Sequence, residues 1–197
     1  MAQLIRTFIA IELNELLHRA LGEVQEELKQ ERAARLVRWV APESIHVTLK
    51  FLGDVDAEQV PTMQRAVSDA CTGVGQFGFE LRGIGAFPNL QRPNVIWIGA
   101  QGQVEAAALL AEKIEVACAA LGFPREERPF TPHLTLGRVK REASLDDKRS
   151  VGEMIAKAQV GIIGAVQVER VGVMKSELRP GGSIYTRLGA IELAREG

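Results

Sequence analysis

The sequence predicts an α+β fold in which two pseudo-symmetric lobes, each with a mostly antiparallel sheet and outer helices, flank a central cleft. Expected strands and helices are interspersed without regular strand–helix alternation, so several strands follow one another directly and should pair antiparallel. A tetrapeptide also recurs, because His-Val-Thr-Leu at residues 46–49 returns as His-Leu-Thr-Leu at residues 133–136. No flexible linker divides the chain. We therefore expect a single two-lobed domain over residues 1–197.

The first half of the chain is expected to contain three strands and two helices. Residues 4–11 are rich in β-forming side chains and predict a strand. Apolar residues recur every three or four positions over 13–28, which is typical of an amphipathic helix. Short β-like runs follow at 36–40 and 45–52, and the second of them alternates strictly. A helix is expected over 58–70.

The second half is expected to contain five strands and two helices. Two strands, 77–84 and 94–100, are separated by a loop of Gly, Pro and Asn residues. A long helix rich in Ala and Leu follows over 104–121 and should end at Gly122. The remaining expected elements are a strand at 133–139, a charged helix at 146–157, and closing strands at 166–174 and 184–193, with Pro180-Gly181-Gly182 between the last two.

Composition narrows the functional classes. The net charge is −1 and the isoelectric point is near 6.3, whereas a protein that coats long nucleic acids usually carries a basic excess. Positive charge nevertheless gathers near both tetrapeptides. Residues 31–50 contain four basic and two acidic side chains, and residues 125–141 contain five basic and two acidic ones. We therefore expect any nucleic-acid ligand to be a short end that is held locally.

The cellular setting is expected to be the cytoplasm. Cys71 and Cys118 are too few for a disulfide framework, and we interpret them as buried free thiols. The N-terminus lacks the layout of a signal peptide, and no apolar run approaches the roughly 20 residues of a membrane span. We expect a soluble monomer with no membrane partner.

Strand alternation assigns each tetrapeptide two faces. Side chains point alternately to opposite sides of a strand, so His46 shares a face with Thr48, and His133 shares one with Thr135. If the lobes are related by a pseudo-twofold axis, these two faces meet across a central groove. One histidine there can donate a proton while the other accepts one, and the threonine hydroxyls can hold phosphate oxygens. We interpret this pattern as a phosphodiester site.

A single His-x-Thr is usually a buried structural histidine, but two copies in matching contexts are much less frequent by chance. The third histidine, His18, lies off the apolar stripe of its helix, and we interpret it as an exposed residue without a role. No cluster of His, Cys or carboxylate residues with ligand spacing accompanies either copy, so no metal or other cofactor is expected.

Further substrate contacts are suggested by position. Lys50 has the parity of His46 and is expected to face the cleft, whereas Arg138 reaches it only through a bulge or a twist. Tyr185 and Phe51 are aromatic residues that can stack on a base, although core packing is the expected use of Phe51. Trp97 is expected in the core. For each basic residue, a solvated surface position is an equally good interpretation.

The residues resemble the two-histidine phosphoesterases, and most closely the bacterial and archaeal RNA 2',3'-cyclic phosphodiesterases, also called 2'-5' RNA ligases (LigT-like). The pair of HxTx motifs at 46–49 and 133–136 carries the resemblance. Agreement over nearly the whole chain is given by the segments Arg6–Ile11, Arg38–Val40, Pro42-Glu43, Lys50–Gly53, Phe87-Pro88, Val95–Gly99, Pro129-Phe130, Pro132, Ser176–Leu178, Pro180–Gly182 and Tyr185.

The resemblance implies a bilobal fold and metal-independent hydrolysis of RNA 2',3'-cyclic phosphate ends to 2'-phosphates. It implies that His46 donates a proton to the departing 3'-oxygen, that His133 activates water, and that Thr48 and Thr135 bind the phosphate. It also implies a reverse reaction, the ATP-independent joining of RNA ends through a 2'-5' linkage. The expected partners are RNA ends or short oligonucleotides that carry a 2',3'-cyclic phosphate.

Two alternatives stay open at this point. One is an enzyme of the same superfamily that acts on a different cyclic or nucleotide-end phosphoester. The other is a non-catalytic module that binds RNA ends or nucleotides, although a pure binder has no need for two histidines in matched positions.

Overall fold

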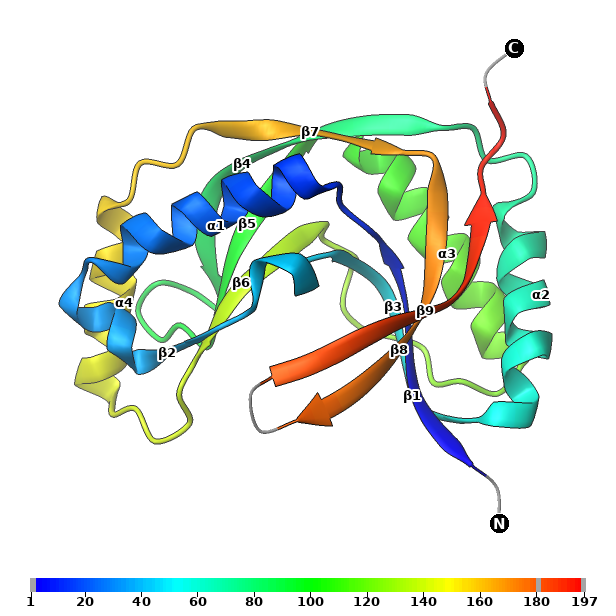
Figure 1. Cartoon of the computed structure of the whole chain (residues 1–197), viewed down its shortest axis with the longest axis horizontal. Coiled ribbons are helices and arrows are strands. Elements are labelled where there is room, and N and C mark those ends of the chain that lie inside the picture. The colour runs from blue at the N-terminus through cyan, green and yellow to red at the C-terminus, as the bar shows by residue number, and fades with distance from the viewer. Residues whose placement is uncertain (1–2, 180–181, 196–197) are drawn as a thin grey trace.

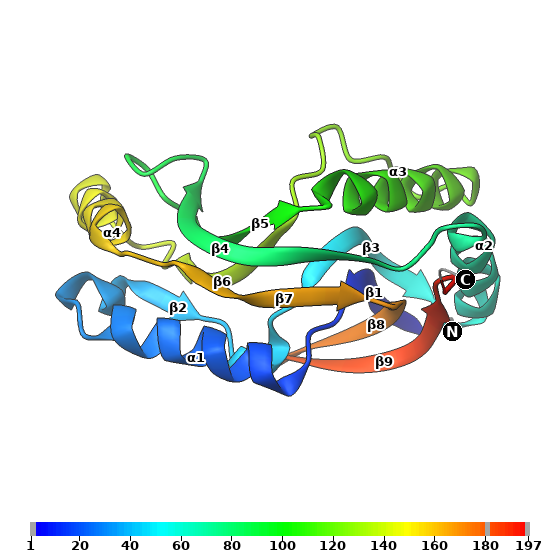
Figure 2. The ribbon, with the colours of Figure 1, turned by 90° about the horizontal axis from the view of Figure 1, so that it is seen from above.

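The computed structural model describes residues 3–179 and 182–195, and in this part of the chain nine strands form one sheet (Figures 1 and 2). The path through the sheet is β7-β4-β5-β6-β3-β1-β8-β9, and β2 pairs with β6. The named strands all pair antiparallel. They are β1 (Leu4–Ile11), β2 (Val37–Trp39), β3 (Val47–Asp56), β4 (Phe77–Phe87), β5 (Val95–Gly102), β6 (His133–Val139), β7 (Ile162–Val168), β8 (Arg170–Arg179) and β9 (Gly182–Glu192).

Four helices flank the sheet in two pairs: α1 (Glu15–Lys29) and α4 (Leu145–Lys157) lie beside one half, and α2 (Val60–Cys71) and α3 (Val104–Ala120) beside the other (Figure 1). The two halves of the sheet are β7-β4-β5-β6 and β3-β1-β8-β9. This confirms the expected α+β class and its two similar halves, although the strands form one continuous sheet. Three short 3₁₀ helices, at Arg32–Leu36, Pro42–Ser44 and Ala57–Gln59, complete the described elements.

Helix α1 shows how the sequence specifies its elements. The side chain of Asn14 accepts a hydrogen bond from the backbone N–H of Leu17 at 2.9 Å, which caps the first turn. The apolar stripe then buries Leu17, Leu21 and Leu28 against the core. Elsewhere in the core, Cys71 and Cys118 are buried free thiols, as expected, and burial raises the pKa of each to about 11.

The prediction of a single strand over residues 166–174 is wrong. The structure has two strands there, because the chain leaves the half that contains β4 and enters the half that contains β1. The break falls at Glu169, between β7 and β8. The sequence carries a signal of this break, since Val166 and Val168 share one parity while Val171 and Val173 have the other, and all four are buried. The turn expected at 180–182 lies partly outside the described residues, which omit 180 and 181.

Two matching β-bulges interrupt the strands of the tetrapeptides. In β3, Thr48 pairs with Ala10 and Lys50 with Ile9, so Leu49 is the additional residue. In β6, Thr135 pairs with Trp97 and Gly137 with Ile96, which makes Leu136 the additional residue. A bulge inverts the alternation of the residues that follow it. The strands therefore carry one pattern before the bulge and the opposite pattern directly after it, until a second irregularity at Leu52 of β3.

The bulge at Leu49 shows that the expected position of Lys50 is wrong. Lys50 turns to the core side of the sheet with its partner Ile9, and it is only 5% exposed. Its Nζ lies 2.6 Å from Glu115 Oε1 of α3 and donates to the carbonyl oxygen of Pro124 at 2.5 Å. Glu115 also accepts from the backbone N–H of Glu126 at 3.0 Å. Lys50 thus ties β3 to α3 and to the segment that leads into the second tetrapeptide.

No helix in the described ranges, 3–179 and 182–195, has the length and apolar character needed to span a membrane.

Replacing Lys50 tests this buried ion pair. Lys50→Met should lower the free energy of unfolding by about 3–5 kcal/mol, because it leaves the Glu115 carboxylate buried without its cation. The double variant Lys50→Met/Glu115→Leu should recover most of that loss. Arg125→Ala removes an exposed ion pair with Glu112 and should cost about 1 kcal/mol or less. Urea unfolding measures all three, and equal effects of Lys50→Met and Arg125→Ala would contradict the role given to the buried pair.

Candidate functional site

The two tetrapeptides lie side by side where the halves of the sheet join. Val47 of β3 pairs antiparallel with Leu134 of β6, and both are buried in the core. Extending this register by one residue in each direction places His46 opposite Thr135 and Thr48 opposite His133. All four side chains point to the face away from the core, which we call the motif face. The histidines occupy one diagonal of this group, and diagonal residues of an antiparallel pair are about 7–8 Å apart.

Both histidines are oriented by the same contact. His46 Nδ1 lies 2.8 Å from the carbonyl oxygen of Ser44, and His133 Nδ1 lies 2.7 Å from that of Thr131. A carbonyl only accepts hydrogen bonds, so Nδ1 carries the proton in each ring. The neutral tautomer therefore leaves Nε2 as the basic atom at both positions. This second-neighbour contact repeats because each histidine directly follows a non-strand residue, Ile45 or Pro132.

Aromatic rings pack against both imidazoles. Phe8 stacks on His46 with ring centroids 4.7 Å apart, and Tyr185 of β9 meets His46 edge-on at 5.2 Å. Phe87 meets His133 edge-on at 4.9 Å. This packing restricts water, and burial is the main reason that the pKa of each histidine lies below 6.5. In both residues the backbone hydrogen bond to Nδ1 opposes this shift.

The charges near the two histidines differ in sign. Glu12 raises the pKa of His46 after the larger effects of burial and the Ser44 hydrogen bond. The Glu12 carboxylate itself accepts two hydrogen bonds from Arg187, at 2.8 and 3.0 Å. Near His133 the corresponding charge is Arg138, which lowers the pKa of that histidine further. The charge of Glu12 therefore favours protonation of His46, against a smaller opposite effect of His18, and Arg138 favours the neutral form of His133.

The other predicted substrate residues have different outcomes. Arg138 is exposed, and the bulge at Leu136 places it on the motif face with Thr135. A bulge is what the sequence required for Arg138 to reach this face. Tyr185 lies beside His46, as described above. Phe51 is 60% exposed and neighbours Phe8 at 5.9 Å, so its expected core position is wrong. The cause is again the bulge at Leu49, which exchanges the faces of Lys50 and Phe51.

His18 is also misplaced by the sequence interpretation. It is partly buried, and its Nε2 lies 3.2 Å from the carbonyl oxygen of Ile45, the residue before His46. It therefore contacts the backbone that leads into the first motif.

Gln25 is a positioning residue that sequence reasoning missed. It is fully buried in α1, and its Nε2 donates to the carbonyl oxygens of Val40 at 2.8 Å and Leu136 at 2.9 Å. Leu136 is the bulged residue of the second motif, so Gln25 fixes the bulge that brings Thr135 and Arg138 to one face. The available signal was a polar residue within the apolar stripe, four positions after Leu21 and three before Leu28.

Gly137 permits close packing on the core side of the same bulge. A Cβ atom at Gly137 would lie 2.6 Å from Val37 Cγ1 of β2, the strand that pairs antiparallel with β6 there. The absence of a side chain at Gly137 therefore lets β2 pack closely beside the end of the second motif.

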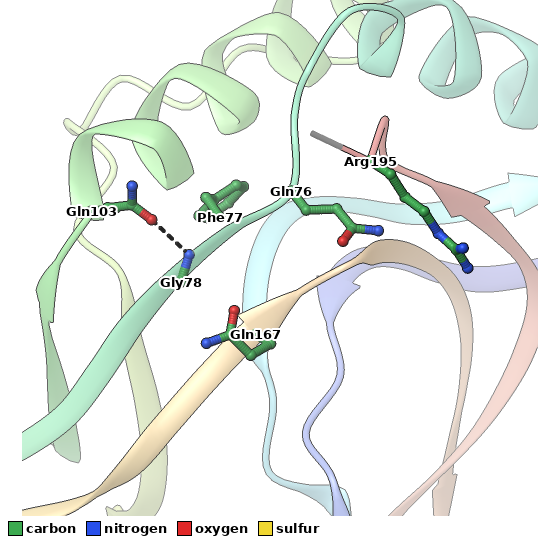
Figure 3. Close-up of a pocket in the computed structure, with 6 residues that line it drawn as sticks. All are labelled: Gln76, Phe77, Gly78, Gln103, Gln167 and Arg195. Atoms are coloured by element: carbon green, nitrogen blue, oxygen red, sulfur yellow. Dashed lines mark hydrogen bonds between the residues drawn. The ribbon is translucent and has the colours of Figure 1, made fainter. Parts of the chain in front are cut away.

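Of two hollows formed by the described residues, one adjoins a histidine. The hollow beside His133 has a volume of about 470 Å³ and is bounded mainly by β4 and β5. The other, of about 430 Å³, lies near the start of β4 and is lined by Gln76, Phe77, Gly78, Gln103, Gln167 and Arg195. Figure 3 shows its amide side chains and the hydrogen bond from the Gly78 N–H to Gln103 Oε1, which measures 2.8 Å. It contains no acid–base pair, so the chemistry is assigned to the motif face.

Among residues 3–179 and 182–195, no three His, Cys, Asp or Glu side chains gather in a way that would hold a metal ion.

Comparison with known proteins agrees with this geometry. The family model described as LigT like Phosphoesterase matches twice, at residues 11–97 and 98–185, with one tetrapeptide in each match. The chain belongs to the LigT-like phosphoesterase family. It is thus a phosphoesterase built from two repeats. The repeat boundary falls within β5, so each matched segment contributes strands to both halves of the sheet.

Individual relatives cover almost the whole chain. An RNA 2',3'-cyclic phosphodiesterase of Methanothermobacter thermautotrophicus is 35% identical over 96% of this chain and 99% of its own length. One of Methanocaldococcus jannaschii is 33% identical over 92% and 96%. Among solved structures, the TT0787 protein of Thermus thermophilus aligns with a TM-score of 0.77 and 30% identity, covering 98% of this chain and 100% of that chain. LigT of Escherichia coli with 3'-AMP, at 22% identity and a TM-score of 0.75, shows the same fold.

Gln25→Met tests the positioning role of Gln25. The substitution keeps the side-chain length but removes both hydrogen bonds, and it should lower the free energy of unfolding by about 1–3 kcal/mol. Amide hydrogen exchange at Val40, whose N–H also donates to the Leu136 carbonyl, should become faster. Gln30→Met is the matched control at the exposed end of the same helix, and equal effects of the two variants would argue against the role of Gln25.

Proposed function

We propose that the protein hydrolyses RNA 2',3'-cyclic phosphate ends to 2'-phosphates by acid–base catalysis between His46 and His133. The observation that carries the proposal is the matched pair of His/Thr units that face one another across β3 and β6. The relatives named above support the substrate class, since their names state RNA 2',3'-cyclic phosphodiesterase activity.

The proton transfers follow from the two free Nε2 atoms. His133 takes a proton from water, whose oxygen forms a bond to phosphorus. The bond between phosphorus and the 3'-oxygen then breaks, and His46 donates a proton to that oxygen. Each transfer is typically worth about 10²–10⁴ in rate. The charges of Glu12 and Arg138 support this order, because Glu12 raises the pKa of His46, against a smaller opposite effect of His18, and Arg138 lowers the pKa of His133.

Other residues of the motif face would hold the substrate. Thr48 and Thr135 lie beside the histidines, where their hydroxyls would hydrogen-bond the non-bridging phosphate oxygens. Arg138 supplies a positive charge on the same face. Tyr185 and the exposed Phe51 offer aromatic surfaces next to His46, where a base of the RNA end would stack. The buried Lys50 is not part of this proposal.

The same groups support the reverse reaction, in which a 5'-hydroxyl takes the place of water and a 2'-5' linkage forms. Conserving the cyclic ester's bond energy in the new linkage removes the need for ATP. We also propose that the enzyme works in the cytoplasm, and that residues 1–197 act as one monomeric, two-lobed domain.

Product analysis on a short RNA with a 2',3'-cyclic phosphate tests the proposed function. We expect a 2'-phosphate product, unchanged turnover in the presence of EDTA, and losses in kcat of about 10²-fold or more for His46→Ala and for His133→Ala. Arg149→Ala is the control, since Arg149 is exposed on α4 and outside the tetrapeptides. Turnover of other phosphoesters alone would favour the first alternative, and binding without turnover would favour the second.

The pH dependence provides a second test. In the free enzyme the active form has His46 protonated and His133 neutral, so kcat/KM should follow a bell-shaped profile. Because burial holds both pKa values below 6.5, kcat/KM should already be falling as the pH rises through 6.5. Bound phosphate adds negative charge and raises both pKa values, so the corresponding fall in kcat should lie at higher pH. A flat profile from about pH 5 to 9 would contradict the two-histidine mechanism.

A further inference from the structure

The hollow beside His133 is built over a glycine. Arg82 of β4 pairs with Gly99 of β5, and Gly99 pairs with His133 of β6, so the three residues form one row across the sheet. Strands are spaced 4.7–4.9 Å apart, which puts the Cα atoms of Arg82 and His133 about 10 Å apart. Gly99 has no side chain, and it lines the hollow together with the Trp97 indole, because a Cβ atom at Gly99 would lie 3.3 Å from Trp97 Cζ3 and 3.2 Å from the Arg82 carbonyl oxygen. The volume of the hollow, about 470 Å³, falls in the range of small-molecule sites.

The Trp97 indole lines one side of the hollow, and Trp97 pairs with Thr135 of the second motif. The next row across the sheet is Gly85, Trp97 and Thr135. The indole lies over Gly85, because a Cβ atom there would be only 2.3 Å from Trp97 Cζ2. The large ring therefore leans toward β4 and away from Thr135, and it lines one side of the hollow. His133, Gly99 and Arg82 all line this one hollow, with the Trp97 indole beside Gly99.

The position beside His46 that corresponds to Gly99 carries a side chain. In the first repeat Ile11 pairs with Val47, and in the second repeat Ile98 pairs with the equivalent Leu134. The residue after Ile98 is Gly99, and the residue after Ile11 is Glu12. Glu12 is therefore the pseudo-symmetric counterpart of Gly99. A charged side chain that is paired with Arg187 stands there instead of a glycine. The pseudo-twofold site therefore has room for an additional group on the His133 side.

The geometry of displacement at phosphorus indicates which part of the substrate would lie on the His133 side. In a displacement at phosphorus, the attacking and leaving oxygens lie roughly in line on opposite sides. His133 serves the attacking oxygen, so whatever carries that oxygen occupies the hollow. Water needs no such space. A nucleoside attached through its 5'-oxygen does, and the indole of Trp97 offers it an apolar and aromatic wall.

We propose that the hollow over Gly99 holds the nucleotide that bears the 5'-hydroxyl during 2'-5' joining, and that Arg82 binds its 3'-phosphate. The inference rests on the proposed function. In joining, His133 removes the 5'-hydroxyl proton, the 5'-oxygen bonds to phosphorus, the bond to the 3'-oxygen breaks, and His46 protonates that oxygen. The opposite sequence cleaves a 2'-5' linkage to a cyclic phosphate and a free 5'-hydroxyl. Arg82 Nη1 donates to Gln101 Oε1 at 3.0 Å, and its remaining N–H groups provide donors for a phosphate.

The test compares two substrates that share the cyclic-phosphate side. One is a mononucleoside 2',3'-cyclic phosphate, hydrolysed by water. The other is a 2'-5'-linked dinucleotide with a terminal 3'-phosphate, which also fills the hollow. Arg82→Ala should lower the ratio of kcat/KM for dinucleotide cleavage to kcat/KM for hydrolysis about tenfold, the loss expected for a hydrogen bond to a charged group. Gly99→Val, which adds a side chain to the lining of the hollow, should lower the same ratio further.

The matched control is Arg149→Ala. Arg149 is also exposed and donates to a side-chain oxygen, that of Asp146 at 3.1 Å, but it lies on α4 away from the hollow. It should leave the ratio unchanged, and thermal unfolding checks that all variants fold. Failure of the wild-type enzyme to hydrolyse the cyclic phosphate would overturn the proposed function. Wild-type hydrolysis without dinucleotide cleavage, or an unchanged ratio in Arg82→Ala and Gly99→Val, would overturn the hollow's role alone.

Discussion

The site depends on one antiparallel contact, the pairing of Val47 with Leu134 where β3 meets β6. This pair is buried and joins the two halves of the sheet, so its register decides which residues of the tetrapeptides meet. A shift of one residue would turn every motif side chain to the opposite face. With the observed register, each histidine lies opposite the threonine of the other motif. The arrangement of the two tetrapeptides and the integrity of the sheet therefore depend on the same interaction.

The β-bulges extend this constraint along both strands. Without them, strict alternation would send Lys50 to the motif face, and Arg138 away from it. The bulge at Leu49 instead sends a lysine to the core, where it pairs with Glu115, and sends Phe51 outward. The equivalent bulge at Leu136 presents Arg138 in the position that corresponds to Phe51. Identical backbone devices in the two repeats thus display an aromatic ring on one side and a cation on the other.

The sequence contains enough information to predict most of the fold and the four central residues of the site. The strands at 4–11 and 133–139 are found with the predicted limits, and the repeated tetrapeptide locates the histidines. The features that sequence reasoning mispredicted are those set by contacts with other strands or distant residues. A bulge is a relation between two strands, so alternation within one strand mispredicted Lys50 and Phe51. Gln25 binds a carbonyl that is 111 residues distant in sequence, and neither its partner nor the bulge it supports is visible in a local pattern.

The departures from symmetry are consistent with the different tasks that we propose for the two histidines. The motifs supply the same imidazole, the same Nδ1 contact and the same threonine on each side. Differences arise only in the neighbours, where Glu12 stands against Gly99 and Phe51 against Arg138. Glu12 raises the pKa of His46 and stands where the second repeat has Gly99, so one substitution between repeats has both an electrostatic and a steric effect. A side that favours a protonated histidine and a side with room for an entering group are what a directional displacement at phosphorus requires.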